Sequence, residues 1–308
     1  MKLFDLHCDT LTKSFDKNLN FIDGNETDIS ISNSVHFEKW IQCLAIFTHD
    51  NYQNQDATDY FKNVVAYLDK LKSKNPSLKE LSSYKEMETE EKNQFRYILT
   101  VENSSILNGK LENIDLIQKA GVKVISLTWN AANQVAGGIA SDIGITEFGK
   151  RAVSSLEEKG IVIDTSHLND RSFYDLCEIA EKPFIATHSN SREICHMQRN
   201  LKDDQIKEIF SRGGIVGINF YPKFIEQLNS KDYFDDFYAH IYHFLSLGGE
   251  SHLSLGSDFD GCNLAGRIDN QLDVFRIYDY LLSRGLKESL LDDIFYNNAF
   301  NFIKNIIK

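Results

Sequence analysis

The sequence predicts an α/β fold built as a single (β/α)8 TIM barrel, and three observations favour that architecture. Eight short apolar runs recur along the 308 residues, and most are separated by a stretch long enough for a helix. The runs are nearly continuous in apolar residues, which is typical of parallel strands buried on both faces. No glycine-rich phosphate loop follows the first run, which disfavours the main alternative, a doubly wound open sheet.

The predicted strands follow one another along most of the chain. They are expected at 2–7, 41–47, 96–101, 123–129, 161–167, 183–188, 214–221 and 252–258. Glycine, proline or polar residues flank each run. Such strands, alternating with helices, predict βαβ units and therefore a parallel sheet.

The predicted helices lie between these runs. Apolar residues recur at helical spacing over 57–72 and 147–159, and two acids open a further predicted helix at 203–212. Helices after residue 271 are expected to complete the outer ring. Residues 8–40 have no clear helical period, which predicts an irregular connection at the barrel mouth, and the charged stretch 76–95 predicts a solvated excursion. A rule of roughly 150 residues per domain would give two domains, but barrels of this length fold as one, so 1–308 is expected to be a single domain.

Composition and charge narrow the classes of function. A hydrophobic fraction of 42% and a charged fraction of 25% are typical of a globular protein rather than a disordered one. The formal net charge of −12 disfavours nucleic acid as a partner. No apolar run reaches the roughly 18 residues that span a bilayer, and the N-terminal segment lacks the long apolar core of a secretory signal. Five widely spaced cysteines without a CxxC pair are expected to be free thiols, so a cytoplasmic location without a membrane partner is predicted.

Residue types that bind metals stand at the ends of the predicted strands. They are His7 and Asp9 after the first run, Glu102 after the third, His167 after the fifth, His188 after the sixth and Asp258 after the eighth. The C-terminal ends of barrel strands meet at one rim, so these side chains are expected to converge. Imidazole and carboxylate ligands suit Zn²⁺ and similar ions, and a carboxylate can bridge two of them. The sequence therefore predicts a metal site at this rim.

Simpler interpretations stay open for individual residues. A single histidine at a strand end is more often hydrogen-bonded than metal-bound. Asp258 could be a metal ligand only, Asp260 could be the surface acid of a turn that Gly261 closes, and Arg199 could be a solvated residue before the helix at 203. The remaining histidines are expected to be structural or surface residues: His36, His49, His196, His240, His243 and His252.

The motifs that contain these residues run along nearly the whole chain. They include DLHCDTL, VEN, LTWNAANQVAGG, PFIATHSNSREICHMQRNLKDD, GGIVGINFYP and LGSDFDG, and the segment 144–222 is the most specific. In this series the sequence resembles the membrane dipeptidase (renal dipeptidase) family of the amidohydrolase superfamily. The resemblance implies a barrel of the metal-dependent hydrolase type. It also implies that His7 and Asp9 ligate one zinc ion, that His167 and His188 ligate a second, and that Glu102 bridges the two.

The same resemblance implies roles on the substrate side. Asp258 corresponds to the acid/base residue of the family, Arg199 to the arginine that receives the C-terminal carboxylate of the substrate, and Tyr221 to a residue that lines the substrate pocket. The family commonly has a histidine where this chain has Trp129. An indole N–H can donate a hydrogen bond but cannot take up a proton, and Asn130 could substitute in part. The family often forms dimers, so a homodimer is expected from the resemblance alone.

These observations predict a binuclear zinc dipeptidase whose substrate is a dipeptide with a free C-terminal carboxylate. Two zinc ions would lower the pKa of a shared water and supply hydroxide to attack the peptide carbonyl, with Asp258 moving the proton to the leaving amine. Other divalent ions such as Co²⁺ or Mn²⁺ could use the same ligands. Two alternatives stay open: a related amidohydrolase that acts on another amide or a lactone, and a non-catalytic metal-binding homologue.

Overall fold

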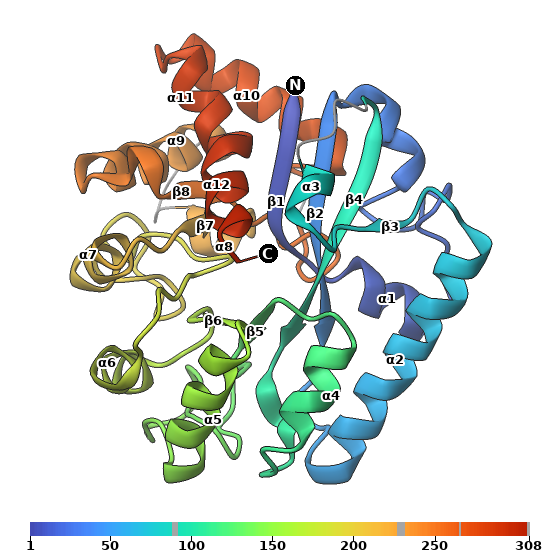
Figure 1. The fold of residues 1–308 in the computed structure, drawn as a ribbon. Helices are drawn as coiled ribbons and strands as arrows, with labels where there is room; N and C mark the ends of the chain where they lie inside the picture. The colour runs from blue at the N-terminus through green and yellow to red at the C-terminus, as the bar shows by residue number, and fades with distance from the viewer. Residues whose placement is uncertain (88–91, 227–231, 265, 307–308) are drawn as a thin grey trace.

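The structure, a computed structural model, has a ring of parallel strands surrounded by helices (Figure 1). It describes residues 1–87, 92–226, 232–264 and 266–306. The strands are β1 (Lys2–Cys8), β2 (Lys39–Phe47), β3 (Lys79–Glu80), β4 (Gln94–Glu102), β5 (Val124–Ser126), β6 (Val162–Asp164), β7 (Val216–Ile218) and β8 (Leu253–Leu255). The sheet runs in the order β6-β5-β4-β2-β1-β8-β7, with the short β3 paired to β4.

The helices form the outer layer (Figure 1). They are α1 (Thr10–Lys17), α2 (Asn54–Lys74), α3 (Tyr84–Met87), α4 (Asn113–Lys119), α5 (Glu147–Glu158), α6 (Asp170–Ile179), α7 (Asp203–Ser211), α8 (Pro222–Ile225), α9 (Tyr233–Ser246), α10 (Val274–Ser283), α11 (Glu288–Asp292) and α12 (Asn298–Lys304). Within the described ranges, none of the helices is long and apolar enough to cross a membrane.

Two residues close the ring between β6 and β7. Isolated parallel bridges join Asp164 to Ile185 and Ala186 to Val216. The Thr165 N–H donates to the Ile185 carbonyl at 2.7 Å, and the Gly217 N–H donates to the Ala186 carbonyl at 2.8 Å. The predicted (β/α)8 barrel is therefore confirmed. Ile185 and Ala186 take the place of its eighth strand, but they form isolated bridges and not a regular strand. The predicted strand at 183–188 shrinks to a pair of bridges, and Pro183 at its start has no N–H to extend the pairing.

The inside of the barrel is filled by one side chain or two from almost every strand. This inner core comprises Phe4, Leu6, Ile41, Cys43, Ile98, Val124, Val162, Ile185 and Ile215, together with Tyr296, Ala299 and Ile303 from the C-terminal helical segment. The last three residues pack against the side chains at the beginnings of the strands, so α12 covers that end of the barrel (Figure 1). The opposite end, where the strands finish, is left for a site.

Two segments differ from their predicted form. The stretch 8–40 contains α1, which the apolar pattern did not reveal because its buried face includes Thr10, Thr12 and Ser14. The stretch 76–95 contains the buried Leu78 and Leu81 and the pairing of β3 with β4, while 88–91 lie outside the described residues. In both segments tertiary contacts order residues that look polar along the chain.

Asp260 ties the loop after β8 to α1. Its carboxylate accepts hydrogen bonds from Thr10 Oγ1 at 2.5 Å, from Lys13 Nζ at 2.6 Å and from the Asp28 N–H at 2.9 Å. The Asp260 N–H in turn donates to Asp28 Oδ2 at 2.7 Å. The Asp260 side chain is fully buried, so it is a structural anchor and not the surface acid of a turn.

Replacing this anchor is expected to destabilise the fold. Asp260→Ala leaves Lys13 and Thr10 without their acceptor, and we expect the free energy of unfolding to fall by about 3 kcal/mol in urea titrations. Asp59→Ala is the matched control, because it removes an ion pair with Lys62 in which both side chains are about half exposed. Equal stability of the two variants would show that Asp260 is not an anchor.

Candidate metal centre

The six predicted metal-site residues converge at the end of the barrel where the strands finish. His7 lies in β1, where the pairing register with β2 shifts, and Asp9 follows the strand. Glu102 is the last residue of β4. His167, His188 and Asp258 stand two or three residues beyond β6, the Ile185–Ala186 bridges and β8. All six are buried, and we call them the Glu102 cluster.

Glu102 lies between two groups of side chains. Its Oε1 is 2.8 Å from His167 Nε2 and 3.8 Å from His188 Nε2, whereas its Oε2 is 3.4 Å from His7 Nε2. His7 Nε2 also lies 3.7 Å from Asp9 Oδ2. Each oxygen of one carboxylate therefore faces a different set of donors, as a bridging ligand requires.

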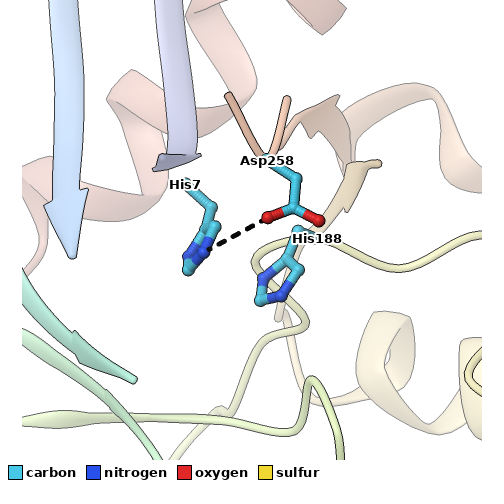
Figure 2. Close-up of side chains that lie close together, drawn as sticks. All are labelled: His7, His188 and Asp258. Atoms are coloured by element: carbon cyan, nitrogen blue, oxygen red, sulfur yellow. Dashed lines mark ion pairs between the residues drawn. The ribbon is translucent and has the colours of Figure 1, made fainter. Parts of the chain in front are cut away.

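Asp258 approaches the cluster from the β8 side. Its Oδ1 is 3.8 Å from His7 Nε2, and the rings of His7 and His188 are stacked with centroids 3.8 Å apart (Figure 2). The other carboxylate oxygen accepts a hydrogen bond from Asn219 Nδ2 at 2.9 Å. Asn219 was not predicted, since no spacing distinguishes it in the segment that also contains Tyr221. It fixes the orientation of the Asp258 carboxylate.

Several candidate ligand atoms of the cluster are not satisfied by hydrogen bonds. Some have no partner among the described residues, and two imidazole nitrogens face each other. His7 Nε2 and Asp9 Oδ1 are buried, and neither has a hydrogen-bond partner in the part of the chain that the structure describes. His167 Nε2 and His188 Nε2 are 3.0 Å apart. Burying such atoms unpaired is costly, and a cation among them would satisfy all of them at once. Three groups of ligands fit a metal ion: His7 with Asp9 and Glu102, Glu102 with His167 and His188, and His7 with His188 and Asp258.

Hydrogen bonds on the far side of two imidazoles orient them toward the cluster. His188 Nδ1 is 2.7 Å from Thr187 Oγ1, whose hydroxyl donates to Asp164 Oδ2 at 2.5 Å. The hydroxyl therefore accepts from Nδ1–H, which leaves a lone pair on Nε2. His167 Nδ1 is likewise 3.2 Å from Asn130 Oδ1. Such outer contacts are typical of metal-binding histidines. Asn130 therefore orients the candidate ligand His167.

Burial and mutual charge perturb the ionisation of the cluster. Burial, with repulsion from Glu102, raises the pKa of Asp9 to about 7. Burial also raises the pKa of Asp258 to about 6, against the opposing influence of His7. The pKa of Glu102 is lowered in spite of burial, because His167 and His7 lie against it. Burial and the charge of Arg199 lower the pKa of His167 to about 4, so this imidazole is neutral near pH 7 and available as a ligand.

The backbone of the loops that carry these residues is unusual. His167, Asp258 and Asp260 adopt positive φ angles of 73°, 63° and 66°. Non-glycine residues seldom occupy this left-handed region, and those that do cluster at functional sites. At Gly261 a Cβ atom would collide with Asp9 Oδ2 and Asp258 Oδ1, so a larger residue would have to displace one of these two carboxylates.

A cavity of about 680 Å³ opens over the cluster. Of the residues predicted on the substrate side, Trp129, Asn130 and Tyr221 line it, as do Asp9, Glu102, His167 and Asp258. Arg199 is 5% exposed, and its Nη1 and Nη2 donate to Ser189 Oγ at 2.8 Å and to the His188 carbonyl at 3.0 Å. Among the described residues its buried Nε has no partner, and the guanidinium lies 5.8 Å from the ring centre of Phe224, which lines the cavity, whereas Arg199 itself is not one of the lining residues. Arg199 is thus buried beside the cavity wall rather than solvated.

Two histidines expected to be structural or at the surface occupy different settings. His240 is fully buried: its Nδ1 accepts from the Ser191 N–H at 3.1 Å and its Nε2 donates to the Ile225 carbonyl at 3.1 Å. His49 lines the cavity. Its place could not be read from the sequence, because it stands two residues beyond β2 in a polar stretch without a motif.

Comparisons with known proteins identify the family of the chain. The model of the membrane dipeptidase family, peptidase family M19, matches residues 1–307. An uncharacterized protein encoded in the pqqA 5' region of Klebsiella pneumoniae is 30% identical over 217 residues, which cover 67% of this chain and 80% of that protein. An uncharacterized dipeptidase of Schizosaccharomyces pombe is 34% identical over 149 residues, 46% of this chain and 36% of that protein.

A solved structure shares the fold over the whole chain. It is a metallopeptidase from Rhodobacter sphaeroides liganded with a phosphinate mimic of the dipeptide L-Ala-D-Ala, with a TM-score of 0.90, 19% identity and 99% of each chain covered. At 19% identity this similarity shows a shared fold. The family assignment comes from the sequence match over residues 1–307. The chain therefore belongs to the membrane dipeptidase family, peptidase family M19, and is a metallopeptidase built on a (β/α)8 barrel.

Proposed function

We propose that this protein is a dipeptidase that works with two divalent metal ions, zinc being the native metal, and that its substrates are dipeptides with a free C-terminal carboxylate. The observation that carries the proposal is the position of Glu102, whose two oxygens face separate groups of candidate ligands. His7 and Asp9 would hold one ion and His167 and His188 the other, with Glu102 shared. The family match supports peptide hydrolysis by a metal centre.

The two ions, when bound, would supply the positive charge that activates a water and polarises the scissile carbonyl. Asp258 would take the proton of that water and pass it to the leaving amine. Asn219 holds one oxygen of the Asp258 carboxylate, so that the other faces His7 and is placed to exchange a proton beside the candidate ligands. Thr187 and Asn130 would keep the imidazoles of His188 and His167 in the ligating tautomer.

Arg199 would receive the carboxylate of the substrate. Its buried Nε has no partner, and a buried guanidinium beside a cavity forms strong, charge-assisted hydrogen bonds with a carboxylate. The engagement of both Nη atoms with the protein favours a second candidate, a related amidohydrolase whose substrate, another amide or a lactone, has no free carboxylate. The panel of substrates for the tests below includes L-Ala-D-Ala, because the similar Rhodobacter sphaeroides metallopeptidase holds a mimic of it.

Zinc should bind with a stoichiometry of two and stabilise the fold. We expect two zinc equivalents by elemental analysis, a higher Tm after loading, and a lower stoichiometry in Glu102→Gln.

The affinity for zinc should also depend on pH. Asp9 with its pKa of about 7 and His7 with its raised pKa carry protons at lower pH, and zinc must displace these protons, so the affinity should fall between pH 8 and pH 6. Asp204→Asn, a change at the first turn of α7, is the control and should bind zinc as the wild type does. A wild type that takes up no zinc contradicts the ligand assignment.

Asp258→Asn should lose activity and keep its metals. We expect kcat to fall by a factor of about 10²–10⁴, since an amide cannot move a proton, while the zinc content stays at two. The assay is hydrolysis of a panel of L-L and L-D dipeptides by zinc-loaded protein. If the variant retains wild-type kcat, Asp258 is not the acid/base. If zinc-loaded wild type hydrolyses no dipeptide, the dipeptidase proposal is wrong.

Changes at Arg199 should separate the two candidate functions. For a dipeptidase, Arg199→Ala and the milder Arg199→Lys should raise KM for dipeptides by about tenfold or more, and leave an amidated dipeptide nearly unaffected. Thermal denaturation checks that both variants are folded. An equal effect on free and amidated substrates would show that Arg199 acts only through the fold and favour the amidohydrolase without a carboxylate requirement.

A further inference from the structure

His49 faces the cavity that holds the Glu102 cluster. It follows β2 by two residues, on the same rim as Glu102, and is half-buried. Its ring lies against that of Trp129, with centroids 4.8 Å apart, and the ring of Trp129 lies 6.3 Å from that of His167. One aromatic ring therefore separates His49 from a candidate metal ligand.

The hydrogen bonding of His49 defines its tautomer. The Asn51 N–H donates to His49 Nδ1 at 3.1 Å, so this nitrogen bears a lone pair and the neutral ring carries its proton on Nε2. Within the described residues, neither His49 Nε2 nor Trp129 Nε1 has a hydrogen-bond acceptor, although both side chains line the cavity. Two N–H donors thus stand side by side, unpaired, on the β2 side of the cavity.

Other potential donors line the cavity, Asn130 among them, and two of those in the described residues are already engaged. Lys13 Nζ is bonded to Asp260 at 2.6 Å, and Thr12 Oγ1 donates to the Ala45 carbonyl at 3.0 Å. Lys17 and Tyr221 also line the cavity, Lys17 with an exposed side chain at the end of α1. The Glu102 cluster, by contrast, contains three carboxylates, which accept hydrogen bonds.

We propose that His49 is a substrate-contacting specificity residue, whose Nε2–H donates a hydrogen bond to an oxygen of the bound dipeptide with the Trp129 indole N–H beside it. This inference rests on the proposed dipeptidase function. The oxygen belongs either to the main chain of the dipeptide or to an acidic or amide side chain, and the chemistry of recognition is the same in both cases. No proton is transferred in this contact, because Nε2–H acts only as a hydrogen-bond donor.

The test compares three variants of the zinc-loaded protein on Ala-Ala, Ala-Gln and Ala-Glu. His49→Phe keeps the ring and removes the donor, and we expect kcat/KM to fall about tenfold or more. His49→Gln restores an N–H donor and should recover most of that loss. His36→Gln, on an exposed histidine, is the matched control and should match the wild type. Zinc content and Tm should stay unchanged in all three.

The pattern of losses identifies the oxygen. A similar loss on all three dipeptides assigns the hydrogen bond to the main chain, and a loss confined to Ala-Gln and Ala-Glu assigns it to the side chain. Activity of His49→Phe within twofold of the wild type on every dipeptide overturns the inference. If the wild type hydrolyses none of them, the proposed function fails, and calorimetric binding of Ala-Glu to wild type and His49→Phe decides the role of His49: weaker binding by the variant supports it, and equal or absent binding overturns it.

Discussion

The burial of three carboxylates among three imidazoles is the constraint on which the rest of the structure depends. Asp9, Glu102 and Asp258 are each less than a tenth exposed, and Glu102 touches histidines on both sides. Burying like charges this close is unfavourable unless protons or cations compensate for them. Without a metal ion to compensate for the charge, protons do so: the pKa values of Asp9 and His7 are raised, so both groups hold their protons more strongly. A site of this kind is built to exchange those protons for metal.

The surrounding fold keeps this arrangement in place through contacts that bridge several elements. Asp260 joins α1, which starts directly after Asp9, to the loop that carries Asp258. Gly261 leaves the room that the carboxylates of Asp9 and Asp258 occupy, and the positive φ angle of Asp258 turns its side chain toward His7. These features sit at the ends of strands whose inner core is sealed at the opposite end by the C-terminal helix. The packed inner core thus supports the strand ends that carry the cluster.

The sequence predicted the barrel and the Glu102 cluster because both follow from local rules. Apolar runs mark buried strands, and polar residues that interrupt the ends of such runs mark the rim. The sequence did not reveal α1, whose buried face is largely polar, or the reduced pairing around Ile185. Nor did it reveal that Asp260 is buried or that His49 lines the cavity. These properties arise from contacts such as that of Asp260 with Asp28, which lie hundreds of residues apart in the chain and have no periodic signature.

The cavity has both hydrogen-bond donors and acceptors in its lining. Under the proposed function, their positions bear on how a dipeptide would lie in the cavity. Asp9, Glu102 and Asp258 of the cluster line the cavity, and their carboxylates accept hydrogen bonds and favour cations. Among the described residues, the N–H donors of His49 and Trp129 have no acceptor and stand on the β2 side, and the buried guanidinium of Arg199 packs against Phe224, which also lines the cavity. If the proposed function holds, a dipeptide whose oxygens met these donors would lie beside the Glu102 cluster. The donors of the cavity would then help to orient the substrate for hydrolysis.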